Sequence, residues 1–129
     1  MEKTVTIRNL KFRVMDSGEM LKRTKQFSID CGHLISSLEM NIINRAYCAQ
    51  LIRSSSSVGA NYRATRRAKS NADFINKFKI VEEELDESLF FLELLVEFNK
   101  LKREQVALLY KEGEELLKII VASLKSLRK

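Results

Sequence analysis

Few residues of this chain combine the types and spacing that catalysis requires. His33 is the single histidine among 129 residues, and the serine run 54–57 has no nearby histidine and acid to activate a hydroxyl. A serine nucleophile needs such a base within hydrogen-bond reach. We therefore predict no catalytic residue and no enzymatic activity, and we interpret the small serine side chains as a surface that lets helices pack closely.

Metal-ligating residues are equally sparse. Cys31 and His33 form one C-x-H pair, Cys48 is distant in sequence, and residues two apart on a helix do not share a face. A structural zinc site needs four ligands, usually as two close pairs. The acidic run 82–87 lacks the Glu-x-x-His pairs of di-iron bundles. We predict free thiols, a solvated acidic helix face, no metal site and no cofactor.

Positive charge is the strongest chemical signal in the sequence. The chain has 23 Lys and Arg against 17 Asp and Glu, a formal net charge of +6, and no acidic residue lies between Arg45 and Ser70. Arginine forks match phosphate oxygens, so nucleic acid is one candidate partner. The alternative is pairing with the acidic run 82–87, within or between subunits. The candidate binding residues are Arg53, Arg63, Arg66, Arg67 and Lys69.

Amphipathic helices must position these residues. Proline is absent and glycine occurs four times, so few tight turns are available, and apolar residues recur every three or four positions. We predict helices at 19–39, 45–67, 71–98 and 104–127, with Ser70 and Asp73 as a capping box and Asn99 as a stop. Short connections predict an all-α, antiparallel, up-down-up-down four-helix bundle at 19–129, preceded by an N-terminal extension at 1–18.

Other residues are predicted to hold helices or subunits together. Buried amides need partners, so Asn61 and Tyr62 are expected in a structural hydrogen-bond network, with a channel or ligand as the alternative. Phe90 and Phe91 are adjacent, so one points away from the core, and outward aromatic residues often mark subunit interfaces. Base stacking is the alternative for them and for Tyr110. The predicted packing or interface set is Ser54, Ser57, Asn61, Tyr62, Phe74 and Phe91. The predicted apolar stripe of the fourth helix is Val106, Leu109, Tyr110, Leu117, Ile120, Leu124 and Leu127.

Nothing in the sequence predicts export or membrane insertion. Residues 1–14 mix charged and apolar positions and lack the continuous apolar region of a signal peptide. No apolar run is long enough to span a bilayer. We therefore expect a cytoplasmic protein with reduced thiols and no membrane partner.

Motifs in the middle of the chain resemble those of a bacterial family. The pattern Q-L-x-R-(small)-x-x-S is present from Gln50 to Ser57, and S-x-A-D-F-I-x-K is intact from Ser70 to Lys77. A third motif, N-Y-R-E-A, aligns on Asn61, Tyr62 and Arg63, with Ala64 in place of glutamate, and Leu85 stands where a small residue is common. Over residues 20–127 the chain resembles the 23S rRNA intervening sequence proteins.

This resemblance implies a four-helix bundle that assembles into a ring, commonly a homopentamer. The chain is also similar to the accessory protein of diversity-generating retroelements, which implies a basic pentameric barrel that binds a reverse transcriptase and nucleic acid. The predicted function is thus a non-enzymatic oligomeric adaptor that binds RNA or DNA, or a nucleic-acid enzyme, through the basic second helix. The alternative is a ring-forming scaffold for a protein partner, without nucleic-acid binding.

Overall fold

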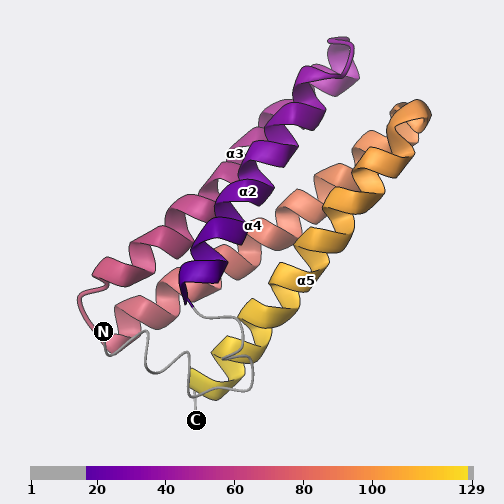
Figure 1. Ribbon diagram of the computed structural model, residues 1–129. Helices are drawn as coiled ribbons and strands as arrows, with labels where there is room; N and C mark the ends of the chain where they lie inside the picture. Colours follow the sequence, from indigo (N-terminus) through magenta and orange to yellow (C-terminus); the bar gives the residue numbers. More distant parts are fainter. Residues whose placement is uncertain (1–16, 128–129) are drawn as a thin grey trace.

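Residues 17–127 form a bundle of four α-helices, shown as a computed structural model in Figure 1. The structure describes residues 17–127, and residues 1–16 of the predicted extension lie outside the described residues. Within 17–127 every regular element is helical and no strand is present, which confirms the all-α four-helix fold. The elements are α2 (Ser17–Ser36), α3 (Ile42–Ala64), η1 (Thr65–Arg67), α4 (Asn71–Phe98), η2 (Lys100–Lys102) and α5 (Arg103–Leu127).

The helices run alternately up and down, so that α2 begins and α5 ends at the same end of the bundle (Figure 1). Helices α2 and α5 lie nearer the viewer, with α3 and α4 behind them. The α3–α4 pair packs most extensively, and α2 and α5 contact each other less than the other neighbouring pairs do. As a result α3 has one long side against α4 and another against α2, and its side chains divide between them.

The ends of α4 lie where the sequence predicts them. The Ser70 hydroxyl accepts a hydrogen bond from the Asp73 main-chain N–H at 3.1 Å, and the Asp73 carboxylate accepts one from the Lys69 N–H at 2.9 Å. These two bonds satisfy main-chain donors at the helix start, as a capping box does. The helix ends at Phe98, directly before Asn99.

The end of α5 at Leu127 also lies where the sequence predicts it, and the remaining helix boundaries differ from the predicted ones by one to three residues. Helix α3 begins at Ile42 because the Asn41 side chain caps it, accepting from the Asn44 N–H at 2.8 Å. It ends at Ala64, where the chain tightens into η1. Helix α2 runs from Ser17 to Ser36 and α5 starts at Arg103. Helix ends fray into tighter turns that sequence periodicity does not resolve.

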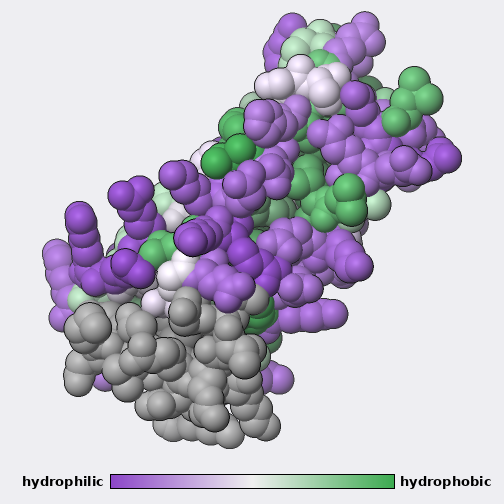
Figure 2. Space-filling model, viewed as in Figure 1, coloured by the Kyte–Doolittle hydropathy of each residue, from purple (hydrophilic) through white to green (hydrophobic). Residues whose placement is uncertain are grey.

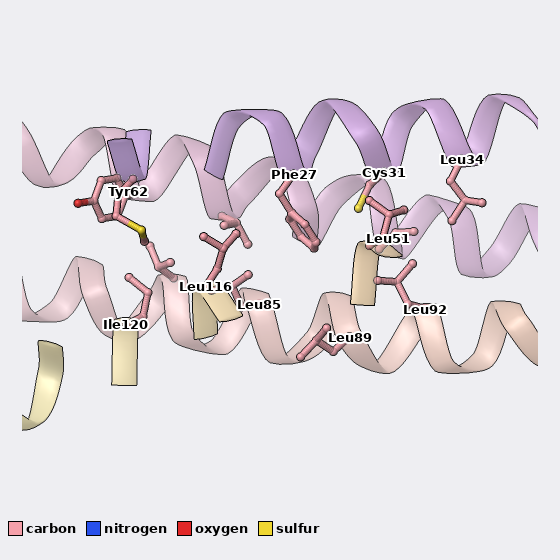
Figure 3. Close-up of a cluster of buried hydrophobic side chains, with 14 of the residues drawn as sticks. Phe27, Cys31, Leu34, Leu51, Tyr62, Leu85, Leu89, Leu92, Leu116 and Ile120 are labelled. Atoms are coloured by element: carbon pink, nitrogen blue, oxygen red, sulfur yellow. The ribbon is translucent and has the colours of Figure 1, made fainter. Parts of the chain in front are cut away.

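A single hydrophobic core runs the length of the bundle. Figure 3 shows Phe27 and Leu34 of α2, Leu51 and Tyr62 of α3, Leu85 and Leu92 of α4, and Leu116 and Ile120 of α5 directed toward one another. Tyr62 is only 1% exposed and packs against Phe78 with 5.7 Å between ring centroids. Burial of these side chains supplies the main driving force for folding.

The apolar stripe of α5 differs from the prediction in its middle. Leu116 is fully buried, whereas the predicted member Leu117 is only partly buried. The reason is Gly113, where a Cβ atom would lie 2.8 Å from Leu89 Cδ2 and 3.1 Å from Phe27 Cε1. The bare helix backbone makes room for the Phe27 ring, so Gly113 belongs to the core face, and Leu116, three residues further on, lies on that same face.

Candidate polyanion-binding groove

An open groove of about 540 Å³ lies between the first half of α2 and the second half of α3. Its walls carry two lysines from α2, one arginine from α3 and one from η1, and its floor is made mostly of small residues. Within the described range 17–127, no acidic and no aromatic residue lines it. We call these residues the basic groove: Leu21, Lys22, Lys25, Ser28, Ser56, Gly59, Ala60, Arg63 and Arg66.

The floor of the groove carries only short side chains because α2 and α3 approach each other closely there. A Cβ atom on Gly59 would lie 3.2 Å from the Ser28 hydroxyl oxygen and 3.4 Å from the Thr24 carbonyl oxygen. The Ser28 hydroxyl also donates to the Ser55 carbonyl oxygen across the two helices at 2.5 Å. The main chains of α2 and α3 therefore form the base of the groove, and the long basic side chains stand above it.

The four cations of the basic groove have no acidic partner among the described residues. Lys22, Lys25, Arg63 and Arg66 are exposed, and none of them forms an ion pair with any residue of the described range 17–127. Hydrophilic side chains cover the surface where α2 begins, whereas apolar atoms run between α2 and α5 (Figure 2). Like charges gathered in a concave site with no acid attract polyanions.

Arg53 reaches from α3 to α4, two helical turns before Ala60 of the groove. Its guanidinium donates to Glu84 at 3.3 Å and also to Glu87, and the hydrogen bond to Glu87 is the main cause of its raised pKa. The alternative that the sequence left open, pairing with the acidic run 82–87, is thus what Arg53 does in this structure. It shares no surface with the basic groove.

Two further candidate residues lie near the basic groove without lining it. Arg67 and Lys69 are exposed beyond the end of α3, and the Lys69 main-chain N–H is bonded to the Asp73 carboxylate, which lowers the Asp73 pKa. The two lysines of the groove are not among the residues predicted from the sequence. Their i, i+3 spacing places them on one face of α2, but only the packing of α2 against α3 places that face beside Arg63.

The predicted packing residues fall into buried and half-buried groups. Ser54 is fully buried and accepts a hydrogen bond from Ser88 of α4 at 2.9 Å. The Asn61 amide donates to the Ser57 hydroxyl at 2.8 Å and to the Ser57 carbonyl at 3.0 Å, so these two form a local bond on α3. Phe74 is buried, with its ring centroid 5.0 Å from that of Phe78.

The aromatic residues near the C-terminal end of α4 form a partly exposed cluster. Phe91 packs against Tyr47 of α3 at 6.2 Å between centroids, and Tyr47 contacts Phe98 at 6.1 Å. Phe90 and Phe98 are each 53% exposed. Tyr110 lies on α5, where its hydroxyl donates to Glu93 at 2.6 Å, and this bond raises its pKa to about 12.

The thiols lie in the interior and not in the groove. Burial raises the pKa of Cys31 to about 12 and raises that of Cys48 as well, so both favour the neutral thiol. Among residues 17–127, no three His, Cys, Asp or Glu side chains gather closely enough to hold a metal ion. None of the helices in that range has the length and apolarity needed to cross a membrane.

Comparisons with known proteins agree with the fold. The family described as 23S rRNA-intervening sequence protein matches residues 17–122. A crystal structure of a protein of unknown function, from the S23 ribosomal protein family of Bacteroides thetaiotaomicron VPI-5482, has a TM-score of 0.73 and 28% sequence identity; the match covers 84% of this chain and 97% of that one. Among curated proteins, no match was found.

Proposed function

Since the chain belongs to the family of 23S rRNA-intervening sequence proteins, we propose that it is a non-enzymatic, oligomeric adaptor that binds nucleic acid. The binding surface is the α2–α3 face, with Arg63 of α3 and Arg66 of η1 at its centre. A homopentamer is the assembly that the sequence resemblance favours. A nucleic-acid enzyme, such as a reverse transcriptase, is the protein partner that would fit this role.

The observation that carries the proposal is the basic groove. Four cations converge on one site from α2, α3 and η1, and no acidic residue of the described lining neutralises them. Arginine and lysine in such a site bind phosphate oxygens, and each phosphate neutralised releases counterions and adds affinity. Arg53 supports the assignment by contrast, because a basic side chain of the same helix that has acidic neighbours is paired.

The exposed aromatic cluster supports self-association. Phe90 and Phe98 are large apolar side chains that are half exposed, and they adjoin the partly buried Phe91 and Tyr47. Aromatic residues are enriched in the buried centres of protein interfaces. Because this cluster lies on α3 and α4 away from the basic groove, subunits can associate through it and leave the groove open.

The non-enzymatic part of the proposal depends on the absence of a base for a nucleophile. His33 is exposed and makes no hydrogen bond or ion pair with the described residues. A serine or cysteine without such a partner remains a weak nucleophile. Localisation in the cytoplasm remains part of the same proposal, because the chain would meet RNA or DNA there.

Fluorescence anisotropy with labelled RNA and DNA at low salt tests the nucleic-acid part of the proposal. We expect the wild-type protein to bind, the double substitution Arg63→Ala and Arg66→Ala to weaken binding at least about tenfold, and Arg53→Ala to leave it nearly unchanged. Arg53→Ala removes one arginine from α3, and the single substitution Arg63→Ala, which removes the same charge from the same helix, is its matched partner. A wild-type protein that binds neither RNA nor DNA would contradict the proposal.

A ring-forming scaffold without nucleic-acid binding is the second candidate, and the Arg53 ion pair favours it because it shows a basic residue of α3 in a purely structural role. In that case Arg63 and Arg66 would hold neighbouring subunits together. Light scattering separates the two functions. A double variant that dissociates supports the scaffold, and an intact oligomer that loses RNA binding supports the adaptor.

A further inference from the structure

The basic groove also indicates how a nucleic acid would be held. We infer that the groove binds one single strand through its phosphate groups, with about three nucleotides lying along its floor, and that duplexes reach only the tips of its basic side chains. This inference rests on the proposed function and specifies its ligand class. It follows from the short side chains of the floor, the spread of the charges and the lack of aromatic, amide and carboxylate side chains in the described lining.

The closely packed base of the groove, with its short side chains, favours a narrow ligand. Its base is set by the close approach of the α2 and α3 main chains at Gly59, and Ala60 and Ser56 beside it have short side chains. Lysine and arginine side chains rise on both sides of this base. A single strand can lie between the lysines of one wall and the arginines of the other, so that its phosphates are neutralised from both sides. The two strands of a duplex are held apart by their base pairs, so a duplex remains above these side chains.

The spread of the charges sets the length of strand that fits. Gly59 lies beside Thr24 and Lys25 of α2, because a Cβ atom on this glycine would be 3.4 Å from the Thr24 carbonyl oxygen and 3.6 Å from the Lys25 Cα. Arg66 lies about seven residues beyond Gly59, which at about 1.5 Å per residue is about 10 Å along the groove. Nucleotides of a stacked strand rise about 3.4 Å each, so this distance holds about three of them.

The described lining contains no aromatic ring and no amide or carboxylate side chain for reading bases in a single strand. Sequence preference in single strands comes from stacking on aromatic rings and from hydrogen bonds to exposed base edges. The groove has no aromatic residue and no amide or carboxylate side chain from the range 17–127; its polar groups are the four cations and two serine hydroxyls. The phosphates are therefore the part of the strand that these residues recognise, and binding should depend strongly on salt and weakly on sequence.

A space-filling substitution on the floor tests the inference directly. Ala60→Leu adds bulk to the groove without changing charge, and Ala49→Leu makes the same change at an exposed position of α3 that does not line it. We expect Ala60→Leu to weaken binding of a short oligothymidylate about tenfold or more, and Ala49→Leu to have no effect. Both positions are exposed, so circular dichroism should show two folded proteins.

The salt dependence gives a second, quantitative measure. About three nucleotides within a longer strand are flanked by four phosphates, and neutralising all four predicts a slope of log K against log salt of about −3. The double substitution Lys22→Ala and Lys25→Ala should reduce this slope to about −1.4. Arg53→Ala should leave the slope unchanged. An oligodeoxyadenylate of equal length should show nearly the same slope as the oligothymidylate, and a duplex of that length should bind more weakly.

The outcomes separate this inference from the proposed function. If the wild-type protein binds no nucleic acid at low salt, both are wrong. If it binds, but Ala60→Leu behaves like Ala49→Leu or the duplex competes as well as the single strand, only the single-strand inference is overturned. Loss of single-strand binding in Ala60→Leu alone, with a reduced slope in the double lysine variant, supports it.

Discussion

The two sides of α3 carry the same kinds of residues and use them differently. Toward α4, Arg53 pairs with Glu84 and Glu87, and the buried Ser54 bonds to Ser88. Toward α2, Arg63 has no ion pair with the described residues, and Ser56 lies exposed on the floor of the basic groove. The neighbouring helix, and not the residue type, decides whether an arginine or a serine of α3 holds the bundle together or faces a ligand.

Bulk added to the serines should show this difference most strongly. Ser54→Leu forces a large side chain into a fully buried site and removes the acceptor of Ser88, so we expect it to lower the free energy of unfolding by about 1–3 kcal/mol. Ser56→Leu adds the same side chain on the exposed side and should change stability by less than about 0.5 kcal/mol. Urea denaturation measures both, and equal losses would show that the two sides of α3 do not differ in packing.

Gly113 and Gly32 show the same contrast between a tightly packed position and an open one on other helices. A Cβ on Gly113 would lie 2.8 Å from Leu89 Cδ2 and 3.1 Å from the Phe27 ring, whereas one on Gly32 would meet only Ile52 Cδ1, at 3.9 Å. Overpacking should outweigh the gain in helix propensity for Gly113→Ala, with a net loss of about 1–2 kcal/mol. Gly32→Ala should stabilise by about 0.4–1 kcal/mol. Thermal unfolding of the pair should give shifts of opposite sign.

The stability of the protein should fall at alkaline pH because of the buried thiol of Cys31. The pKa of the buried Cys31 is about 12 in the folded protein, compared with its ordinary value of 9.0 when exposed after unfolding. Because the unfolded chain loses this proton first, its contribution to stability is complete below about pH 9 and is lost as the pH rises toward about 12. Urea midpoints measured from about pH 8 to about pH 10.5 should fall.

The Cys31→Ala variant isolates that part of the pH dependence. It should be less stable at every pH because of the cavity, but its midpoint should fall less steeply above about pH 9. Tyr110, whose pKa is also about 12, acts in the same direction, so Tyr110→Phe serves as a second control. A slope that Cys31→Ala leaves unchanged would assign the effect to other groups.

The smallest contrast concerns the arginines themselves. Arg53→Ala removes an exposed pair with Glu84 and Glu87 and should lower the melting temperature slightly at low salt, with no difference at high salt because exposed pairs are screened. Arg63→Ala should leave the melting temperature unchanged or raise it, since it relieves repulsion among the four cations of the basic groove. A larger loss of stability for Arg63→Ala than for Arg53→Ala would indicate a structural role for the groove.

The elements were predictable because each carries its own local signal. The α4 bounds follow from Ser70, Asp73 and Asn99, and the core positions of α2 follow from apolar spacing, since all of Met20, Phe27 and Leu34 are buried. The start of α3 is harder to predict because its cap is a single asparagine, Asn41. The stripe of α5 is misplaced at Leu116 because Gly113 has a packing role that a glycine in isolation does not reveal.

The candidate site was predictable only in part. Arg63 and Arg66 stand out in an acid-free segment of sequence, which is a local property. Lys22 and Lys25 do not stand out, because they lie far earlier in the chain and join the arginines only when α2 packs against α3.

The sequence by itself determined that this chain forms four amphipathic helices, that its second helix is basic and small, and that it resembles one bacterial family. These properties follow from periodicity, capping residues and charge, which act over a few neighbouring residues. The tertiary structure decided which arginines of the described helices have no acidic partner and that two lysines of α2 complete their site. Such questions depend on which helix faces which, and helix packing brings together charges that are far apart in the chain.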